Sequence, residues 1–300
     1  MMDGTHMMQS NLAPAPQFQP DHVVIGGRTL GFDEILNEKL LTPSKIAELS
    51  EAFKYNKPFP YLVFDGLFSP VLLELMYEDF DRLKKDDLRV FNTMNEKKLS
   101  TQPFTCLGHA SELYFNTIHS PIFINFLTEI TGIEGLITDP GLSRGGLHHI
   151  PTGGKFAMHI DFNRHTDTKL DNRLVFITYL NKDWLPSYGG ALELWNMEDE
   201  KCETEVQPVF GRSVLFAHSS RSLHGHPTPV DAPNGRPRRS AAAYYYTNGR
   251  SDGESTSSHT SIFFKRRKAS RREKITTSIK YMTPQIIVDG IQKLKALLRK

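Results

Sequence analysis

Residues 156–167, FAMHIDFNRHTD, contain the pattern His-x-Asp twice, at His159/Asp161 and at His165/Asp167. Imidazole and carboxylate are common metal ligands, and residues i and i+2 of a strand share one face, where both can bind the same ion. The first pair ends KFAMHID, which is typical of a strand, whereas the second lies in the polar stretch NRHTDTKLDN, which favours turns. We therefore expect the first pair to bind a metal and the second to lie in a surface loop.

A catalytic metal needs a third protein ligand, and RSVLFAHSSRSLHGHP offers three histidines, His218, His224 and His226. Spacing alone does not choose among them. Two histidines and one carboxylate on one face of an octahedron leave positions open for Fe(II) and oxygen chemistry, unlike a closed structural zinc site. The alternatives are a zinc-binding jelly roll and polar loop histidines without a metal.

An oxygenase of this type also needs a cation that anchors a dicarboxylate. Arginine is suited to this because its planar guanidinium binds a carboxylate through two hydrogen bonds and keeps its charge when buried. RRSAAAYYYTNGR begins with Arg238 and Arg239, which a strand directs to opposite faces. Alternation alone does not show which arginine points inward.

The elements that carry these residues form a β core preceded by helices. TPSKIAELSEAFKYN, SPVLLELMYEDFDRLKK and SPIFINFLTEITG each start with Ser or Thr followed by Pro, which is typical of a helix N-terminus. PYLVFDGL indicates a short strand between the first two helices. From about residue 135, short β-rich runs separated by turn residues predict a jelly roll. These runs are GLITD, GGLHHI, KFAMHID, NRLVFITYLN, GALELWN, EVQPVF, RSVLFAH and RRSAAAYYYT.

The chain divides into three parts. Residues 1–42 form an N-terminal extension whose first 20 residues are polar and aperiodic, so we expect it to be partly disordered. Residues 43–266 form the main domain, and residues 267–300 form a basic helical tail. The favoured interpretation of the tail is a solvated basic helix. The alternative is a tail that contacts nucleic acid, a ribosome or an acidic partner. Its apolar stripe in TPQIIVDGIQKLKALLRK could join two copies in a homodimer.

Composition excludes several classes of protein. The chain has no apolar run of the roughly 18 residues that a membrane span needs and no secretory signal, so a cytoplasmic location is expected. Cys106 and Cys202 could make at most one disulfide. A metal site would therefore use histidines and carboxylates.

Five ordered segments resemble the prolyl-4-hydroxylase-like Fe(II)/2-oxoglutarate dioxygenases. They are HID at 159–161, FITYLNKDW at 176–184, GGALELW at 189–195, SLHGHPTPV at 222–230 and RRSAAAYYY at 238–246. KPFPYLVFDGLFSP also looks like the first segment of that family, so the similarity extends over residues 57–266. The resemblance implies a mainly β fold with flanking helices, a double-stranded β-helix or cupin-like jelly roll, and makes residues 43–266 the dioxygenase domain.

By position, the resemblance implies that His159, Asp161 and His224 are the iron ligands and, together with Arg238, the catalytic residues. His224 takes the place of the distal histidine in the family's motif. His226 would then be a neighbour that lines the same strand.

The resemblance also implies a site for 2-oxoglutarate. Arg238 would anchor the distal carboxylate, with Arg239 as the alternative, and Tyr179 would donate a hydrogen bond to the same carboxylate. Ile177 and Leu192 would line the apolar wall of the pocket.

The sequence departs from the family at two positions that face substrate. His149 stands where many prolyl hydroxylases have a tyrosine, and Tyr244 stands where a tryptophan is common. We expect both to line the substrate pocket. His148 and His149 could shape substrate binding or serve the structure alone, so the resemblance does not settle peptidyl-proline specificity.

The resemblance implies an enzyme that uses Fe(II), 2-oxoglutarate and O2, with ascorbate as a reductant. It would hydroxylate an unactivated C–H bond of a prolyl residue or a small metabolite and release succinate and CO2. Asp161 argues against a halogenase, because that related class lacks the carboxylate. The alternatives are a tailoring oxidase that acts on a sugar or antibiotic precursor, including ring closure, and a non-catalytic jelly roll that binds RNA or a ribosome through the basic tail.

Overall fold

The computed structural model of the 300-residue chain describes residues 22–254 and 257–264. The first 20 residues, expected to be disordered, lie outside the described residues. So does the basic tail, for which a solvated helix was expected, with a nucleic-acid contact and a homodimer as alternatives. The chain divides into two units, Met1–Ile262 and Phe263–Lys300, and the following description concerns the first.

The helices lie mainly in the first half of the chain and the strands mainly in the second. The helices are α1 (Phe32–Ile35), α2 (Pro43–Tyr55), α3 (Pro70–Asp79), α4 (His109–Ile118) and α5 (Pro121–Thr131), with 3-10 turns η1 (Glu38–Leu40), η2 (Phe80–Arg82), η3 (Lys85–Asp87), η4 (Pro186–Tyr188) and η5 (Pro233–Gly235). The early strands are β1 (His22–Ile25), β2 (Arg28–Gly31), β3 (Tyr61–Asp65), β4 (Leu88–Asn92), β5 (Lys97–Thr101) and β6 (Ile137–Thr138). The later strands are β7 (Gly146–Ile150), β8 (Phe156–Ile160), β9 (Asp171–Tyr179), β10 (Leu192–Asn196), β11 (Lys201–Val206), β12 (Arg212–Ala217), β13 (His224–His226), β14 (Arg238–Thr247) and β15 (Ile262–Phe263).

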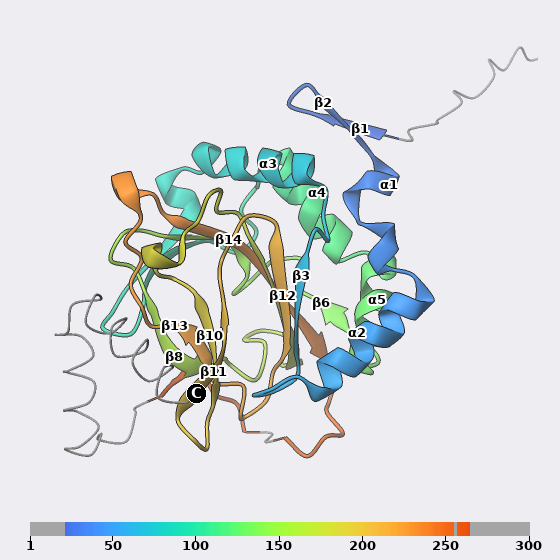
Figure 1. Cartoon of the computed structure of the whole chain (residues 1–300), viewed down its shortest axis with the longest axis vertical. Helices are drawn as coiled ribbons and strands as arrows, with labels where there is room; N and C mark the ends of the chain where they lie inside the picture. Colours follow the sequence, from blue (N-terminus) through green and yellow to red (C-terminus); the bar gives the residue numbers. More distant parts are fainter. Residues whose placement is uncertain (1–21, 255–256, 265–300) are drawn as a thin grey trace, which may run out of the picture. The chain divides into compact units, whose positions relative to one another are not determined.

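Two antiparallel sheets form the core of the domain (Figure 1). The larger has the order β3-β12-β9-β14-β7-β5-β4, with β6 paired to β14, and the smaller contains β11-β10-β13-β8 in that order. Non-consecutive strands are neighbours in both sheets, as in a jelly roll. The predicted fold class, mainly β with flanking helices, is confirmed.

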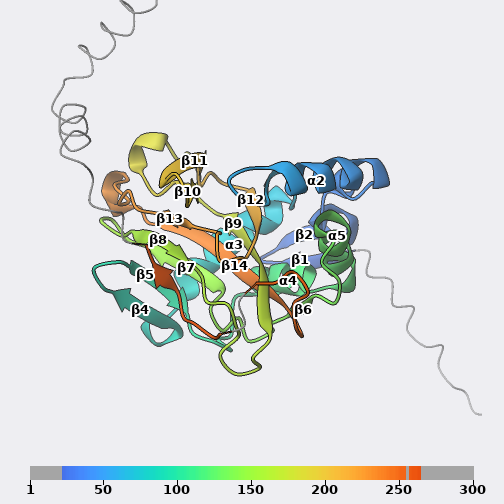
Figure 2. The same cartoon turned by 90° about the horizontal axis from the view of Figure 1, so that it is seen from below.

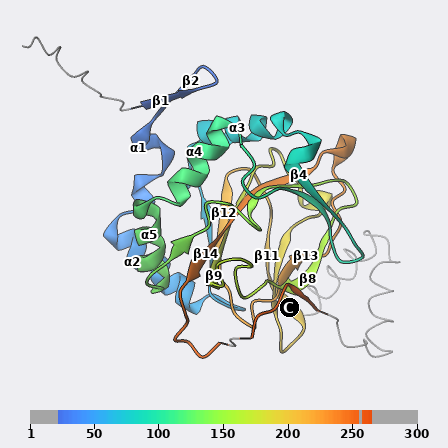
Figure 3. The same cartoon turned by 180° about the vertical axis from the view of Figure 1, so that it is seen from behind.

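Successive side chains of β14 point to opposite faces of the sheet, and the two faces have different surroundings. Ala241, Ala243 and Tyr245 belong to the hydrophobic cluster shared with α2 to α5, which lie on the outer face of the larger sheet (Figures 2 and 3). Arg238 and Ser240 lie on the other face of the strand and line a cavity between the sheets. The strand therefore separates a helical layer from the interior, where a site can form.

The predicted helices and most predicted strands are present. Helix α5 begins as expected, with the Ser120 side chain accepting a hydrogen bond from the Phe123 backbone N–H. The run EVQPVF overlaps β11 only at its first two residues, and the sequence did not predict β13, β1, β2, β4 or β5. The described residues include no helix long and apolar enough to cross a membrane.

Part of the predicted N-terminal extension packs against the domain. Ile25, Leu30 and Ile35, from β1, β2 and α1, are buried in the main hydrophobic cluster. The domain boundary at residue 43 stays a prediction.

Helix α4 was not predicted, because a distant residue caps its N-terminus. The Asp79 carboxylate, at the end of α3, accepts hydrogen bonds of 2.9 Å from both the backbone N–H and the hydroxyl of Ser111. A Cβ at Gly108 would lie 1.9 Å from Asp79, so glycine is required for this approach. The cap depends on tertiary structure and leaves no local signal.

Candidate active site

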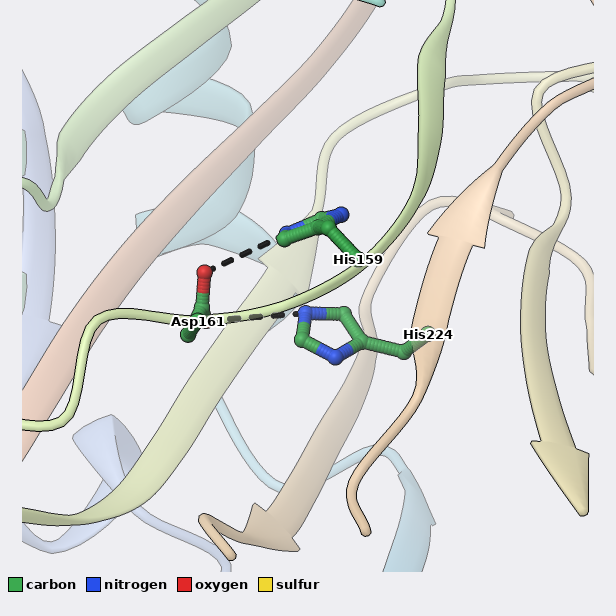
Figure 4. A group of neighbouring side chains, drawn as sticks. All are labelled: His159, Asp161 and His224. Carbon is green, nitrogen blue, oxygen red and sulfur yellow. Dashed lines mark hydrogen bonds and ion pairs between the residues drawn. The ribbon is translucent and has the colours of Figure 1, made fainter. Parts of the chain in front are cut away.

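His159, Asp161 and His224 converge between the two sheets (Figure 4). His159 lies on β8, Asp161 directly follows that strand, and His224 lies on β13 opposite His159 in the register of the two strands. One ligand atom from each residue lies within 4.8 Å of the others. All three side chains are buried, so they form a compact group of ligand atoms shielded from water.

Backbone carbonyls orient both imidazoles. The Nδ1 atoms of His159 and His224 each lie 2.8 Å from the carbonyl oxygen two residues earlier, of Ala157 and Ser222 respectively. These contacts leave each Nε2 on the side of Asp161, where the neutral rings can bind a metal ion. Outer hydrogen bonds of this kind fix the tautomer and orientation of metal-binding histidines.

The Asp161 carboxylate fits a cation at this position. Its Oδ1 lies 3.2 Å from His159 Nε2 and its Oδ2 lies 3.5 Å from His224 Nε2. Oδ2 is buried and has no hydrogen bond. Burial raises the pKa of Asp161, but His224 and His159 outweigh this effect and hold it well below its usual value. The donor set of two imidazoles and one ionised carboxylate is the set that suits Fe(II).

The structure distinguishes the three histidines between which spacing could not choose. His224 joins the group with Asp161, whereas His218 Nε2 lies 3.1 Å from the backbone oxygen of Asp161 and holds that segment in place. His226 lies on β13 two residues after His224 and lines the adjoining cavity.

This cavity extends from the three ligand residues to Arg238. Its walls come from β5, β7, β8, β9, β10, β13 and β14. The lining residues are Lys98, His148, Ile150, Phe156, His159, Asp161, Val175, Ile177, Leu192, His224, Gly225, His226, Arg238, Ser240, Ala242 and Tyr244. The cavity is mostly apolar, with a metal-ligand group and a buried guanidinium among its walls.

The structure places the two arginines of β14 on opposite faces. Arg238 is 4% exposed; its Nε donates to the Gly190 carbonyl oxygen at 2.7 Å, and its guanidinium lies 4.8 Å from the centre of the Tyr179 ring. Arg239 instead forms an ion pair of 2.8 Å with Asp81, outside the cavity. Of the two candidates, only Arg238 can reach a ligand in the cavity.

Comparisons with known proteins agree with this geometry. The sequence model described as the 2OG-Fe(II) oxygenase superfamily matches residues 145–246, which include all three ligand residues and Arg238. This segment is similar to the 2OG-Fe(II) oxygenase superfamily and holds the His159–Asp161–His224 group. The match and this group identify a 2-oxoglutarate-dependent dioxygenase whose cofactors are Fe(II) and 2-oxoglutarate.

Solved structures support the fold of this oxygenase. A prolyl-4-hydroxylase from Pseudomonas putida is 17% identical, with a TM-score of 0.51, over 68% of this chain and 100% of that chain. A prolyl hydroxylase from Trichoplax adhaerens, solved with a peptide fragment of the hypoxia inducible factor oxygen degradation domain, is 16% identical, with a TM-score of 0.50, over 71% and 95%. No curated protein sequence matches the chain. The likeness confirms the double-stranded β-helix.

Three of the predicted pocket residues of the oxygenase, Ile177, Leu192 and Tyr244, line the cavity. His149 pairs with Arg239 and Leu99 in the sheet and is not among the residues that line the cavity, whereas its neighbour His148 lines it. The place of His149 in a substrate pocket stays a prediction. A shift of one residue along a strand exchanges the two faces, and the sequence did not fix this register.

The second His-x-Asp pair has a structural role, but the expectation of a surface position for His165 is wrong. His165 is 6% exposed, and its Nε2 lies 3.2 Å from both Asp139 Oδ2 and Ser143 Oγ. Its Nδ1 accepts backbone N–H bonds from Asp167 and Thr168. The ring closes the turn, and neither nitrogen remains for a metal.

The sequence did not reveal the contribution of Lys98, on β5. Its Nζ lies 2.9 Å from Glu96 and 4.1 Å from the centre of the Phe156 ring, which stacks on the His159 ring at 3.8 Å. The Lys98 ammonium group, the Phe156 ring and the His159 imidazole are therefore stacked one on the next at one side of the oxygenase site. The strand KKLST has a single apolar residue, so it gave no recognisable alternation.

Proposed function

We propose that this oxygenase hydroxylates an unactivated C–H bond of a prolyl residue or a small metabolite. One atom of O2 would enter the substrate as a hydroxyl group, and the other would enter succinate as 2-oxoglutarate loses CO2. The observation that carries the proposal is the presence of the His159–Asp161–His224 group and the buried Arg238 in one cavity.

The three ligand residues would hold Fe(II) on one face and leave the cavity side open. Bound there, Fe(II) would supply the activation of O2 for insertion into a C–H bond. The protein's part is to fix the two Nε2 atoms through Ala157 and Ser222 and to keep the Asp161 carboxylate ionised and dry.

Arg238 would bind the distal carboxylate of 2-oxoglutarate. No carboxylate in the described part of the chain pairs with its guanidinium, whose contacts are the Gly190 carbonyl oxygen and the Tyr179 ring. A buried charge without a counter-charge costs several kcal/mol, which an anionic ligand would offset. The Tyr179 hydroxyl, which is buried beside this guanidinium, would be a second donor.

The apolar wall would exclude water from the reacting groups. Ile177 and Leu192 line the cavity that also contains Arg238 and the ligand residues, and Val175 and Ala242 add to its apolar surface. A dry site strengthens the electrostatic interactions within it and limits side reactions of the activated oxygen.

Turnover with a substrate panel tests the proposal. The purified protein, Fe(II), 2-oxoglutarate, ascorbate and isotopically labelled O2 are incubated with proline-containing peptides in one arm and with sugars and antibiotic precursors in the other. We expect succinate formation to rise with one class, together with one labelled oxygen atom in the product. Asp161→Ala should abolish both signals. If no class raises succinate formation above the substrate-free rate, the proposed substrate classes are wrong.

A tailoring oxidase that closes a ring is the second outcome of the same assay. Its product would lose two hydrogen atoms and gain no labelled oxygen, whereas a hydroxylase product gains one oxygen atom. Mass spectrometry of the product distinguishes the two reactions.

A further inference from the structure

His226 is a buried polar side chain without a partner. It is 4% exposed, lies on the same face of β13 as His224 and lines the same cavity as Arg238. Neither Nδ1 nor Nε2 has a hydrogen bond. Buried polar groups in proteins are almost always hydrogen-bonded, so this ring is placed to bind a ligand.

The surroundings of His226 favour an anionic acceptor. The charges that act on the ring most strongly are those of Arg238 and Lys98, both cations. Glu96 pairs with Lys98 and is not part of the cavity wall. In either protonation state an imidazole offers at least one N–H donor, so Arg238 and His226 together present donors to one region.

The strand register places His226 at the Arg238 end of the cavity. His224 pairs with His159 at the ligand group, whereas His226 pairs with Phe156, at the start of β8. In the larger sheet Arg238 pairs with Ile150, the last residue of β7, and the turn from Ile150 leads back to Phe156. Two residues along a strand span roughly 7 Å, which is comparable to the length of a five-carbon dicarboxylate.

We propose that His226 donates a hydrogen bond to the distal carboxylate of 2-oxoglutarate, beside Arg238. This inference rests on the proposed function, because it assumes that 2-oxoglutarate lies between the ligand group and Arg238. His226 is thus a further cosubstrate-binding residue, which sets how tightly and in what orientation 2-oxoglutarate is held.

Close packing of β13 on β8 fixes the ring in advance. A Cβ at Gly225 would lie 2.9 Å from the backbone oxygens of both Phe156 and Ala157, so the glycine between the two histidines allows the strands to approach. The Phe156 ring meets the His226 ring edge to face at 6.3 Å. A donor held in this way loses little conformational freedom when the ligand binds.

An anaerobic titration with Fe(II) tests the assignment. The affinity for 2-oxoglutarate is read from the visible charge-transfer band of the chelate in the wild type, His226→Val and His226→Gln. The same proteins are titrated with 2-oxopentanoate, which keeps the chelating end and replaces the distal carboxylate by a methyl group. We expect His226→Val to bind 2-oxoglutarate roughly 10- to 100-fold more weakly, as for a hydrogen bond to a charged group.

The comparison of ligands isolates the distal carboxylate. Affinity for 2-oxopentanoate should change less than about twofold in His226→Val, because that ligand offers no acceptor there. His226→Gln should recover part of the loss, since its amide keeps a donor. If His226→Val does not fold, His226→Met also lacks the donor and serves in its place.

Two results would overturn the assignment. One is an unchanged affinity of His226→Val for 2-oxoglutarate; the other is an equal loss for both ligands, which would mean that His226 only shapes the cavity. Absence of the charge-transfer band in the wild type would instead contradict the proposed function, so the two failures are distinguishable.

Discussion

The pairs His159/Asp161 and His165/Asp167 have the same pattern six positions apart, and the structure uses them in different ways. In the first pair, the imidazole is anchored through Nδ1 and directs Nε2 at a buried carboxylate. In the second, Nδ1 accepts two backbone N–H bonds and Nε2 contacts Asp139 and Ser143, while the Asp167 side chain is exposed to solvent.

The difference shows that the pattern matters less than the partners of each ring nitrogen. A metal site needs one nitrogen held by an outer partner and the other left for the ion. A histidine with both nitrogens in hydrogen bonds stabilises a turn instead. The contrast between the pairs can therefore be tested one residue at a time.

The largest expected effect comes from the two aspartates. Asp161→Ala should lower Fe(II) affinity and turnover by more than roughly 100-fold, because losing a ligand exceeds the 10- to 100-fold cost of losing an outer partner. Asp167→Ala, the matched control, should change neither. Metal content after anaerobic reconstitution, together with succinate formation, measures both. Equal losses in the two variants would remove the distinction between the pairs.

A similar comparison of Arg238 and Arg239, the two arginines of β14, concerns the binding of 2-oxoglutarate. Arg238→Leu should weaken 2-oxoglutarate binding by at least roughly 30-fold, since a buried charge pair loses one partner. Arg239→Leu, which removes an ion pair with the mostly exposed Asp81, should change it less than about threefold. Calorimetric titration of the metal-loaded proteins with 2-oxoglutarate measures the affinity of each variant. A larger effect for Arg239 would contradict the observed register of β14.

A third prediction concerns the structural histidine. His165→Ala should lower the free energy of unfolding by about 1–3 kcal/mol, because the backbone N–H groups of Asp167 and Thr168 and the Asp139 carboxylate lose a partner. Urea denaturation of the metal-free protein measures the change. Fe(II) affinity should stay within about twofold of the wild type; a loss of metal with unchanged stability would assign His165 to the site.

The last prediction is a pH dependence in the same structural region. Burial lowers the pKa of His119 from 6.5 to about 4, although Asp139 acts in the opposite direction. The folded state therefore favours the neutral ring, and its contribution to stability is complete above pH 6.5 and is lost as pH falls toward about 4. Urea denaturation over this range should show a shallower decline in His119→Gln. Identical slopes in the two proteins would contradict this assignment.

Elements with strong local signals were predictable from the sequence. Strands β9, β12 and β14 are long apolar runs, and α2, α3 and α5 begin with Ser or Thr followed by Pro. The first His-x-Asp pair was identified because it ends an alternating strand. These predictions depend on residues close together in the chain.

The other features depend on residues far apart in the chain. Strand β13 has only three residues, so its pattern is too short to recognise, and its pairing with β8 is what selects His224. The register of β7, set by pairing with β14, decides that His148 and not His149 lines the cavity. Asp79 caps α4 from another helix.

A crystal structure of the protein with Mn(II) and 2-oxoglutarate tests the central claim most directly, because the anomalous signal of the metal locates it independently of the refined side chains. The account predicts a single peak bound by His159 Nε2, Asp161 and His224 Nε2, with the distal carboxylate of 2-oxoglutarate against Arg238. A peak beside His165, or 2-oxoglutarate bound away from Arg238, would contradict it.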